Sequence, residues 1–100
     1  MSERQWSRRP ITDAEVPHLD VLGERIRSLR CAAELHQVEL AVRAEMSRSG
    51  LGKIERGERR TRRSTIERLA SVLTPDDVAA TTAALVALAG PALAPESEYA

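Results

Sequence analysis

Basic side chains gather in the middle of this chain, between residues 48 and 63, where only Glu55 and Glu58 oppose them. The residues after Leu73 carry acids and no base, so the formal net charge of zero hides an uneven distribution. This density of positive charge favours binding of a polyanion, and a solvated basic surface is the plainer alternative. The basic residues are Arg48, Lys53, Arg56, Arg59, Arg60, Arg62 and Arg63.

The sequence contains no set of residues suited to catalysis. We find no nucleophile–base pair, no cluster of metal ligands and no glycine-rich loop that could hold a phosphate. His18 and His36 are far apart in the chain and have no evident third ligand. Cys31 is a single cysteine, which excludes an internal disulfide and is typical of a reducing compartment. We therefore expect no enzymatic activity, no metal and no cofactor.

The shortage of aromatic residues points to the fold class. The chain has one Trp, one Tyr and no Phe, so its core must consist of Leu, Ile, Val and Ala. Such a core suits packed helices better than sheets. With 100 residues, 42% hydrophobic and 30% charged, the chain is expected to form one all-α globular domain. It shows no signal peptide, and its most apolar run (78–89) is too short to cross a bilayer, so we expect a cytoplasmic protein with no membrane partner.

Apolar residues at helical spacing predict three helices before residue 58. The first starts at Asp20, the second covers 37–44, and the third starts after the N-cap Ser47 and ends at Gly57. We interpret residues 1–19 as an irregular arm. The expected buried positions are Leu22, Ile26, Leu29 and Ala33 in the first helix, Val38, Leu40 and Ala41 in the second, and Leu51 and Ile54 in the third.

Two further helices are predicted after a basic loop at 58–63. The fourth starts either with a capping box of Ser64 and Glu67 or one turn earlier, at Thr61. The fifth is capped by Thr74, starts at Pro75 and ends at Gly90, before a frayed tail at 91–100. The fourth helix is expected to bury Ile66, Leu69, Ala70 and Leu73.

Residues 35–57 resemble the helix-turn-helix of Cro and the phage repressors, the XRE family. The matching features are Gln37 at the start of the first motif helix, the run 39–41 (Glu-Leu-Ala), Ser47 after the turn, and the run 54–57 (Ile-Glu-Arg-Gly). The flanks at 23–30 and 69–70 match as well, so the resemblance covers roughly residues 22–73. It implies a compact five-helix, lambda-repressor-like domain, with DNA binding in 20–74 and the fifth helix at 75–90.

The resemblance also assigns roles to individual residues. It implies a structural ion pair between Arg30 and Glu55, and it makes Arg48 and Lys53 the main base readers. Phosphate contacts are expected from Gln37, from the helix start at Ser47 and from the loop, where one arginine could enter a minor groove. The base-reading positions are Arg48, Ser49, Gly52 and Lys53, and the loop residues are Arg59, Arg60, Arg62 and Arg63.

Three positions depart from the family pattern. Glu45 stands in the turn where a glycine with positive φ is usual, so we expect a strained left-handed glutamate. Gly50 and Gly52 lie within the third predicted helix, which is the recognition helix of the motif, and each costs about 1 kcal/mol of helix stability relative to alanine. They either allow close approach to DNA or indicate a helix that no longer reads bases.

The resemblance implies a transcriptional regulator of bacterial or phage origin, a dimeric repressor that reads an inverted repeat in double-stranded DNA. The alternative is a protein-binding module with the same fold, of the antitoxin or coactivator type. A stripe on the fifth helix is either the homodimer interface or a cap on the protein's own core. Arg4 and Trp6 belong to an arm that either follows the DNA or has no fixed structure. The stripe on the fifth helix consists of Val78, Thr82, Leu85 and Ala89, and Val86 lies beside it.

Overall fold

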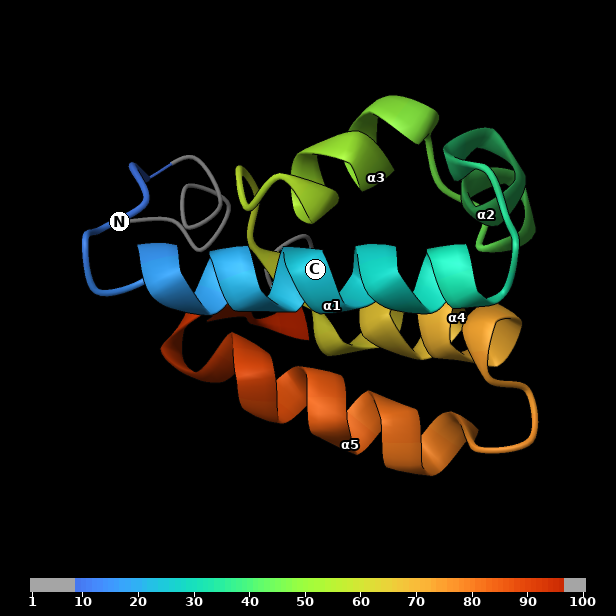
Figure 1. Ribbon diagram of the computed structural model, residues 1–100. Helices are drawn as coiled ribbons and strands as arrows, with labels where there is room; N and C mark the ends of the chain where they lie inside the picture. Colours follow the sequence, from blue (N-terminus) through green and yellow to red (C-terminus); the bar gives the residue numbers. More distant parts are fainter. Residues whose placement is uncertain (1–8, 97–100) are drawn as a thin grey trace.

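The computed structural model describes residues 9–96 and contains five α-helices in that range (Figure 1). The predicted all-α fold class is confirmed, with the addition of one short 3-10 turn and a pair of two-residue strands. The elements are α1 (Val16–Ala32), α2 (Gln37–Arg43), α3 (Arg48–Glu55), β1 (Thr61–Arg62), α4 (Arg63–Leu73), α5 (Val78–Ala89), η2 (Gly90–Ala92) and β2 (Leu93–Ala94).

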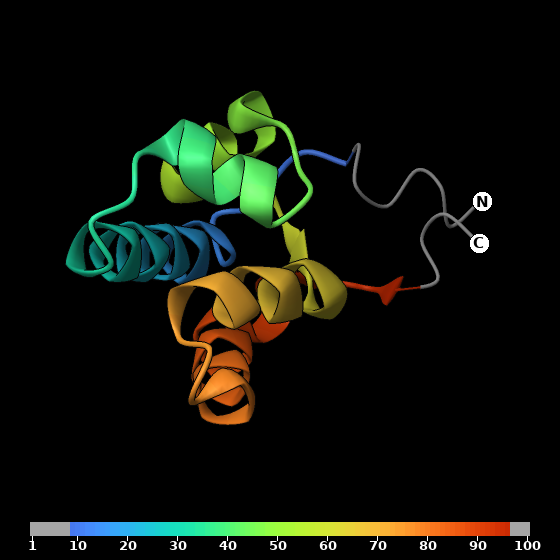
Figure 2. The same ribbon diagram turned by 90° about the vertical axis from the view of Figure 1, so that its right-hand side faces the viewer.

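Helix α1 runs through the middle of the molecule, with α2 and α3 on one side and α5 on the other (Figures 1 and 2). Helix α4 packs against α5 and reaches α2, which closes the core. The core is aliphatic, as the composition predicts. The predictions that Val38 and Ala33 are buried are wrong. Val38 is 52% exposed, because it precedes the buried Leu40 by two residues and so faces the opposite side of α2. Ala33 is exposed because α1 has ended one residue earlier, and Leu29 is half-buried. The largest buried side chains are Leu19, Leu22, Ile26, Leu40, Leu51, Ile66, Leu69 and Leu85.

The first helix begins at Val16, and the prediction of a start at Asp20 is wrong. Pro17 lies in its first turn, where a missing N–H costs nothing because that donor has no partner within a helix. The Glu15 carboxylate accepts the Thr12 backbone N–H at 3.0 Å just before the helix. The extra turn buries Leu19 and lengthens the apolar stripe of α1.

Three consecutive helices end in the same way, with one residue at positive φ. These residues are Glu34 after α1, Glu45 after α2 and Gly57 after α3, with φ of 57°, 57° and 73°. At the end of α2 the Met46 amide donates to the Ala41 carbonyl at 2.9 Å, the long hydrogen bond of a Schellman motif. The left-handed Glu45 was expected from the sequence, and Glu34 is a second case that the sequence analysis missed.

Helix α4 begins at Arg63, and neither predicted capping box forms. Instead, the Ser64 backbone N–H donates to the Glu96 carboxylate at 2.9 Å, and this bond holds the pKa of Glu96 below its ordinary value. A carboxylate from 32 residues away thus takes the place of a local cap.

The segment after α5 forms η2 and β2, so the prediction of a frayed tail is wrong for residues 91–96. Strand β2 pairs in parallel with β1, with Thr61 opposite Leu93 and Arg62 opposite Ala94. Ala92 and Ala94 are buried. Residues 97–100 lie outside the described part of the chain.

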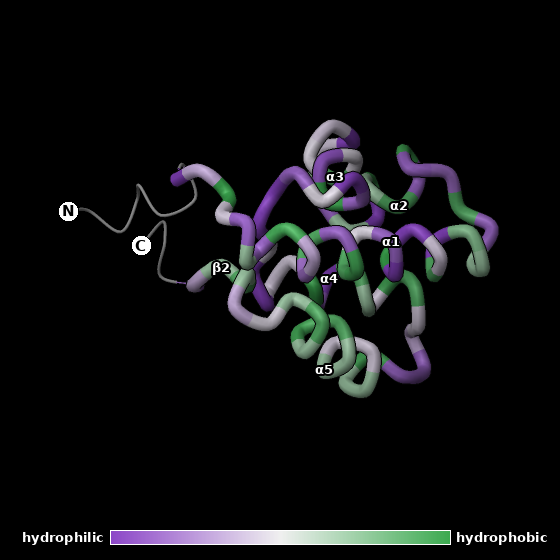
Figure 3. Tube along the Cα trace, turned by 60° about the vertical axis from the view of Figure 1, so that its left-hand side comes forward, coloured by the Kyte–Doolittle hydropathy of each residue, from purple (hydrophilic) through white to green (hydrophobic). Residues whose placement is uncertain are grey.

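Helix α5 begins at Val78 and not at the predicted Thr74–Pro75. It ends at Gly90, as expected. Most of α5 is coloured as hydrophobic in Figure 3. Thr82, Leu85 and Ala89 are buried within the protein itself, so at these positions the expected dimer face is wrong and α5 caps the core. Val78 and Val86 stay half-buried.

A buried ion pair ties the N-terminal segment to the basic loop. The Arg60 guanidinium forms two hydrogen bonds with the Glu15 carboxylate, at 2.6 and 2.8 Å, and donates to the backbone carbonyls of Arg9 and Pro10. Only 2% of the Arg60 side chain is exposed. The prediction that Arg60 contacts DNA is therefore wrong. Residues 9–15 are held by the domain, and Arg4 and Trp6 lie outside the described residues.

We predict that Glu34→Gly and Glu45→Gly each stabilise the protein by about 1 kcal/mol, because glycine adopts positive φ without the steric cost that a side chain carries. Each melting temperature should rise by roughly 4–8 °C in thermal unfolding followed by circular dichroism. The matched control is Glu24→Gly, at an exposed position inside α1, which should lower stability by about 1 kcal/mol. A fall in melting temperature for Glu45→Gly would contradict the strain.

Hydrogen bonds from Arg60 hold the pKa of Glu15 at about 2, against its ordinary value of 4.5. Because the folded state lowers this pKa, the ionised Glu15 contributes stability above pH 4.5 that is lost as the pH falls towards 2. The loss amounts to about 3 kcal/mol in urea unfolding. Glu15→Gln should lower the free energy of unfolding at pH 7 and reduce its further fall between pH 4.5 and 2, whereas Asp13→Asn, at an exposed position, should leave both unchanged. If Glu15→Gln loses as much stability in acid as the wild type, Glu15 is not the group responsible.

Candidate nucleic-acid interface

Helices α2 and α3 form a helix-turn-helix whose second helix is held firmly against α1. The Ser47 hydroxyl caps α3 by accepting the Gly50 N–H at 2.9 Å, as predicted. Ala41 is 1% exposed between the helices. A Cβ on Gly23 would lie 2.4 Å from the Ile54 carbonyl oxygen, so a glycine is required where α1 crosses α3. This close crossing sets the direction of α3.

The outward side of α3 presents Arg48, Ser49 and Lys53, which are all exposed. Gly52 was also predicted to read bases on this side, but it is buried. The Arg56 guanidinium covers it, and a Cβ at Gly52 would lie 3.0 Å from Arg56 Nη1. Arg56 in turn pairs with Glu58 at 3.0 Å. The outward side of α3 thus includes Arg56, which was counted among the basic residues but not predicted to contact DNA.

Gly50 also lies under an arginine side chain, that of Arg59. It is buried, and a Cβ there would lie 2.7 Å from Arg59 Nη1 and 3.0 Å from the Ser47 hydroxyl. Helix α3 nevertheless remains regular from Arg48 to Glu55. The two glycines therefore make room for arginine side chains folded back over α3, an explanation that differs from both alternatives drawn from the sequence.

A polar network joins α1, α2 and α3 at the end of the recognition helix. Arg30 forms two hydrogen bonds with Glu55, at 2.8 and 3.0 Å, and also donates to the Leu35 carbonyl. The Glu55 partner raises the pKa of Arg30. Gln37 donates from Nε2 to Glu55 at 3.0 Å. The network places Gln37 at the start of α2, close to the end of α3; its contact with DNA phosphate stays a prediction.

The loop arginines do not share one environment. Arg59 and Arg63 are exposed, Arg62 is half-buried in β1, and Arg60 belongs to the buried ion pair. A further arginine, Arg68 on α4, donates from Nε to the Ala44 carbonyl at the end of α2. The sequence offered no signal for Arg68, because it lies on the polar face of α4 and meets α2 only in the folded chain.

Among residues 9–96, no group of three or more His, Cys, Asp and Glu side chains is arranged to hold a metal ion. Within the same residues no helix is both long and apolar enough to cross a membrane.

A family model described as a helix-turn-helix domain matches residues 21–88, from the first turns of α1 almost to the end of α5. No curated protein and no solved structure matches the chain. The matched region includes the turn at Glu45, the capped helix α3 and the Arg30–Glu55 pair. With this match over more than half of its length, the chain belongs to the helix-turn-helix domain family of DNA-binding proteins.

Proposed function

We propose that this protein is a sequence-specific transcriptional regulator that binds double-stranded DNA as a dimer and reads an inverted repeat. The observation that carries the proposal is the position of Arg48, Ser49 and Lys53, exposed on a recognition helix whose other side is buried against α1. The N-terminal part of such a helix enters the major groove in helix-turn-helix proteins.

Arg48 is the main base reader in this proposal. It is the first residue of α3, it is exposed, and its guanidinium can donate two hydrogen bonds to O6 and N7 of guanine. Lys53 lies four residues after Ser49 and therefore on the same side of the helix, one turn farther along. Arg56 extends this side, although Glu58 neutralises part of its charge.

Contacts to the DNA backbone are proposed for groups that flank α3. Arg59 and Arg63 are both exposed. Arg63 is proposed to reach a phosphate as it stands, whereas Arg59 would first leave its position over Gly50. The capped start of α3 at Ser47 carries outward N–H groups, and Gln37 keeps a second Nε2 hydrogen besides the one given to Glu55. These contacts would position α3 and would not specify sequence.

A dimer is proposed because a single recognition helix reads only a few base pairs. Two copies would place their α3 helices about 34 Å apart, on half-sites one helical turn apart. Repression then follows from occupation of a promoter. Since Thr82, Leu85 and Ala89 are buried, a dimer must use other surfaces, such as the outer side of α5 with its exposed Ala83 and Ala87.

A second candidate is a protein-binding module of the antitoxin or coactivator type. The observation that favours it is a pair of valines on the outer side of α2: Val38 is 52% exposed and Val42 is 70% exposed. They lie four residues apart and so form a short apolar stripe. A partner helix that covers this stripe would also obstruct the neighbouring Arg48.

Selection of bound duplexes from a random library is expected to enrich an inverted repeat. Arg48→Ala should relax the preference at one guanine in each half-site and weaken binding by about 1–3 kcal/mol. The matched control is Arg27→Ala, an exposed arginine on α1, which should change neither. Equal enrichment by Arg48→Ala would contradict the base-reading role, and the absence of any enriched sequence would favour the protein-binding candidate.

Arg63→Gln is expected to weaken binding to all duplexes about equally, because a phosphate contact carries no sequence information. The slope of log K against log salt concentration should fall by about 1, as one fewer counterion is released. Fluorescence anisotropy at several salt concentrations measures this slope. A changed consensus sequence with an unchanged slope would mean that Arg63 contacts a base.

A further inference from the structure

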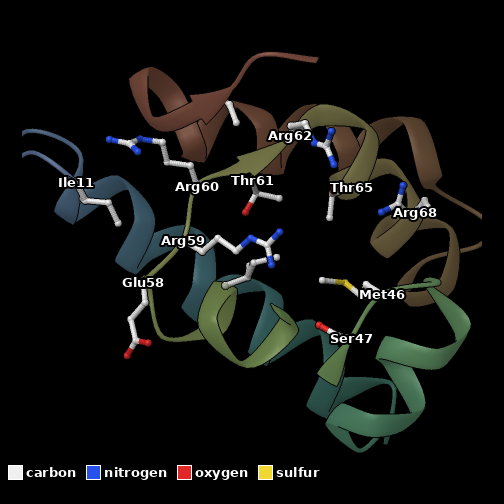
Figure 4. Close-up of a pocket in the computed structure, with 12 residues that line it drawn as sticks. Ile11, Met46, Ser47, Glu58, Arg59, Arg60, Thr61, Arg62, Thr65 and Arg68 are labelled. Atoms are coloured by element: carbon white, nitrogen blue, oxygen red, sulfur yellow. The ribbon is translucent and has the colours of Figure 1, made fainter. Parts of the chain in front are cut away.

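A polar cavity of about 400 Å³ lies between the start of α3, the basic loop and α4 (Figure 4). Its walls come from segments far apart in the chain: the turn at Ser47, the loop residues around Thr61, and Thr65 and Arg68 on α4. The volume falls in the range of roughly 300–1,000 Å³ that is usual for small-ligand sites. This cavity plays no part in the base-reading face described above.

One buried hydroxyl in its wall has no partner. Thr61 is 3% exposed, and its Oγ1 forms no hydrogen bond among the described residues. Figure 4 shows this hydroxyl turned inward, towards the side of the cavity where the Arg59 side chain lies. A buried hydroxyl without a partner is unusual, because leaving it unpaired costs free energy. Thr82 Oγ1 on α5 is also without a partner among the described residues, but only Thr61 lines the cavity, where a bound acceptor would satisfy its hydroxyl.

The charges around the cavity are predominantly positive. Arg59, Arg62 and Arg68 line it, and they come from the loop, β1 and α4. Its lining contains one acid, Glu58, which is already paired with Arg56 at 3.0 Å. Among the described residues no carboxylate forms an ion pair with Arg59 or Arg68, and the Arg68 Nε bond goes to a neutral carbonyl.

We propose that this cavity binds the phosphate group of a small phosphorylated ligand. A phosphate offers several acceptor oxygens in a tetrahedral arrangement, which suits guanidinium groups and a hydroxyl that approach from different elements. The Thr61 Oγ1 donates to one oxygen, and Arg59 and Arg68 supply the charge. The remaining volume accommodates the organic part of the ligand.

The proposed ligand site also bears on DNA binding, and this consequence rests on the proposed function. Arg59 lines the cavity and is a proposed contact to the DNA backbone. A ligand that holds Arg59 in the cavity removes that contact, so ligand and DNA weaken each other's binding by the same factor.

The test uses the DNA-free protein, titrated with inorganic phosphate and with adenosine 5′-monophosphate at constant ionic strength, with adenosine as the control without phosphate. Amide chemical shifts around Ser47, Thr61 and Arg68 should move saturably with both phosphates and not with adenosine. Thr61→Val keeps the shape and removes the hydroxyl, and it should weaken binding roughly tenfold. Arg59→Gln should weaken it similarly, and Arg25→Gln, an exposed arginine on the α1–α5 side, should have no effect.

Shifts that do not saturate, or affinities that Thr61→Val and Arg59→Gln leave unchanged, would overturn the proposal. If Thr61→Val has a lower melting temperature than the wild type, the phosphate affinity of Arg59→Gln decides whether the proposal stands. The Arg59 side chain is exposed, so its replacement leaves the core intact. DNA affinity is measured in parallel. Weaker DNA binding by Thr61→Val without any binding of free phosphate would show that the cavity takes a backbone phosphate of DNA, and the small-ligand proposal would fail while the proposed function stood.

Discussion

The position of the recognition helix depends on the buried carboxylate of Glu55. This residue ends α3, and a negative charge there is disfavoured by the helix dipole. Two hydrogen bonds from Arg30 and one from Gln37 offset that cost, because they join the carboxylate to the last turn of α1 and the first turn of α2. The side chain of Glu55 is only 3% exposed, so water cannot replace these partners. Desolvation of both charges offsets much of their attraction, but removal of either partner would leave the other charge buried and unpaired.

A second set of polar contacts restrains the basic loop from both sides of the chain. Glu15, before α1, binds Arg60, and Glu96, after β2, binds the amide of Ser64 at the start of α4. The strand pair β1–β2 lies between these two contacts. Part of the charge imbalance along the sequence is therefore compensated inside the protein. The exposed side chains of Arg59, in the loop, and Arg63, at the start of α4, remain on the surface of a segment whose backbone is held in place.

Glycine is used here in unexpected places. Of the four helix ends with positive φ, two carry glutamate, at Glu34 and Glu45, where glycine would be less strained. Meanwhile Gly50 and Gly52 occupy the interior of α3, where alanine would favour the helix. The guanidinium ends of Arg59 and Arg56 lie over these two positions, 2.7 and 3.0 Å from where a Cβ would be. The free-energy cost of the left-handed glutamates and of the helical glycines is outweighed by the buried aliphatic core and the polar networks, which stabilise the same backbone conformation.

The sequence by itself determined the helical class, the turn at Glu45, the cap at Ser47, the end of α5 at Gly90 and the pairing of Arg30 with Glu55 through the family resemblance. All but the last depend on local spacing, whereas the Arg30–Glu55 pair joins residues 25 positions apart and was inferred only because the resemblance extends over both. Only the tertiary structure decided that Arg60 is buried, that Glu96 caps α4, that α5 covers the core and that Arg59, Thr61 and Arg68 surround one cavity. The Arg60–Glu15 and Ser64–Glu96 contacts join residues 45 and 32 positions apart, and the cavity forms only where the loop and α4 meet the start of α3. A charged or apolar side chain does not reveal in sequence which distant partner will remove it from water.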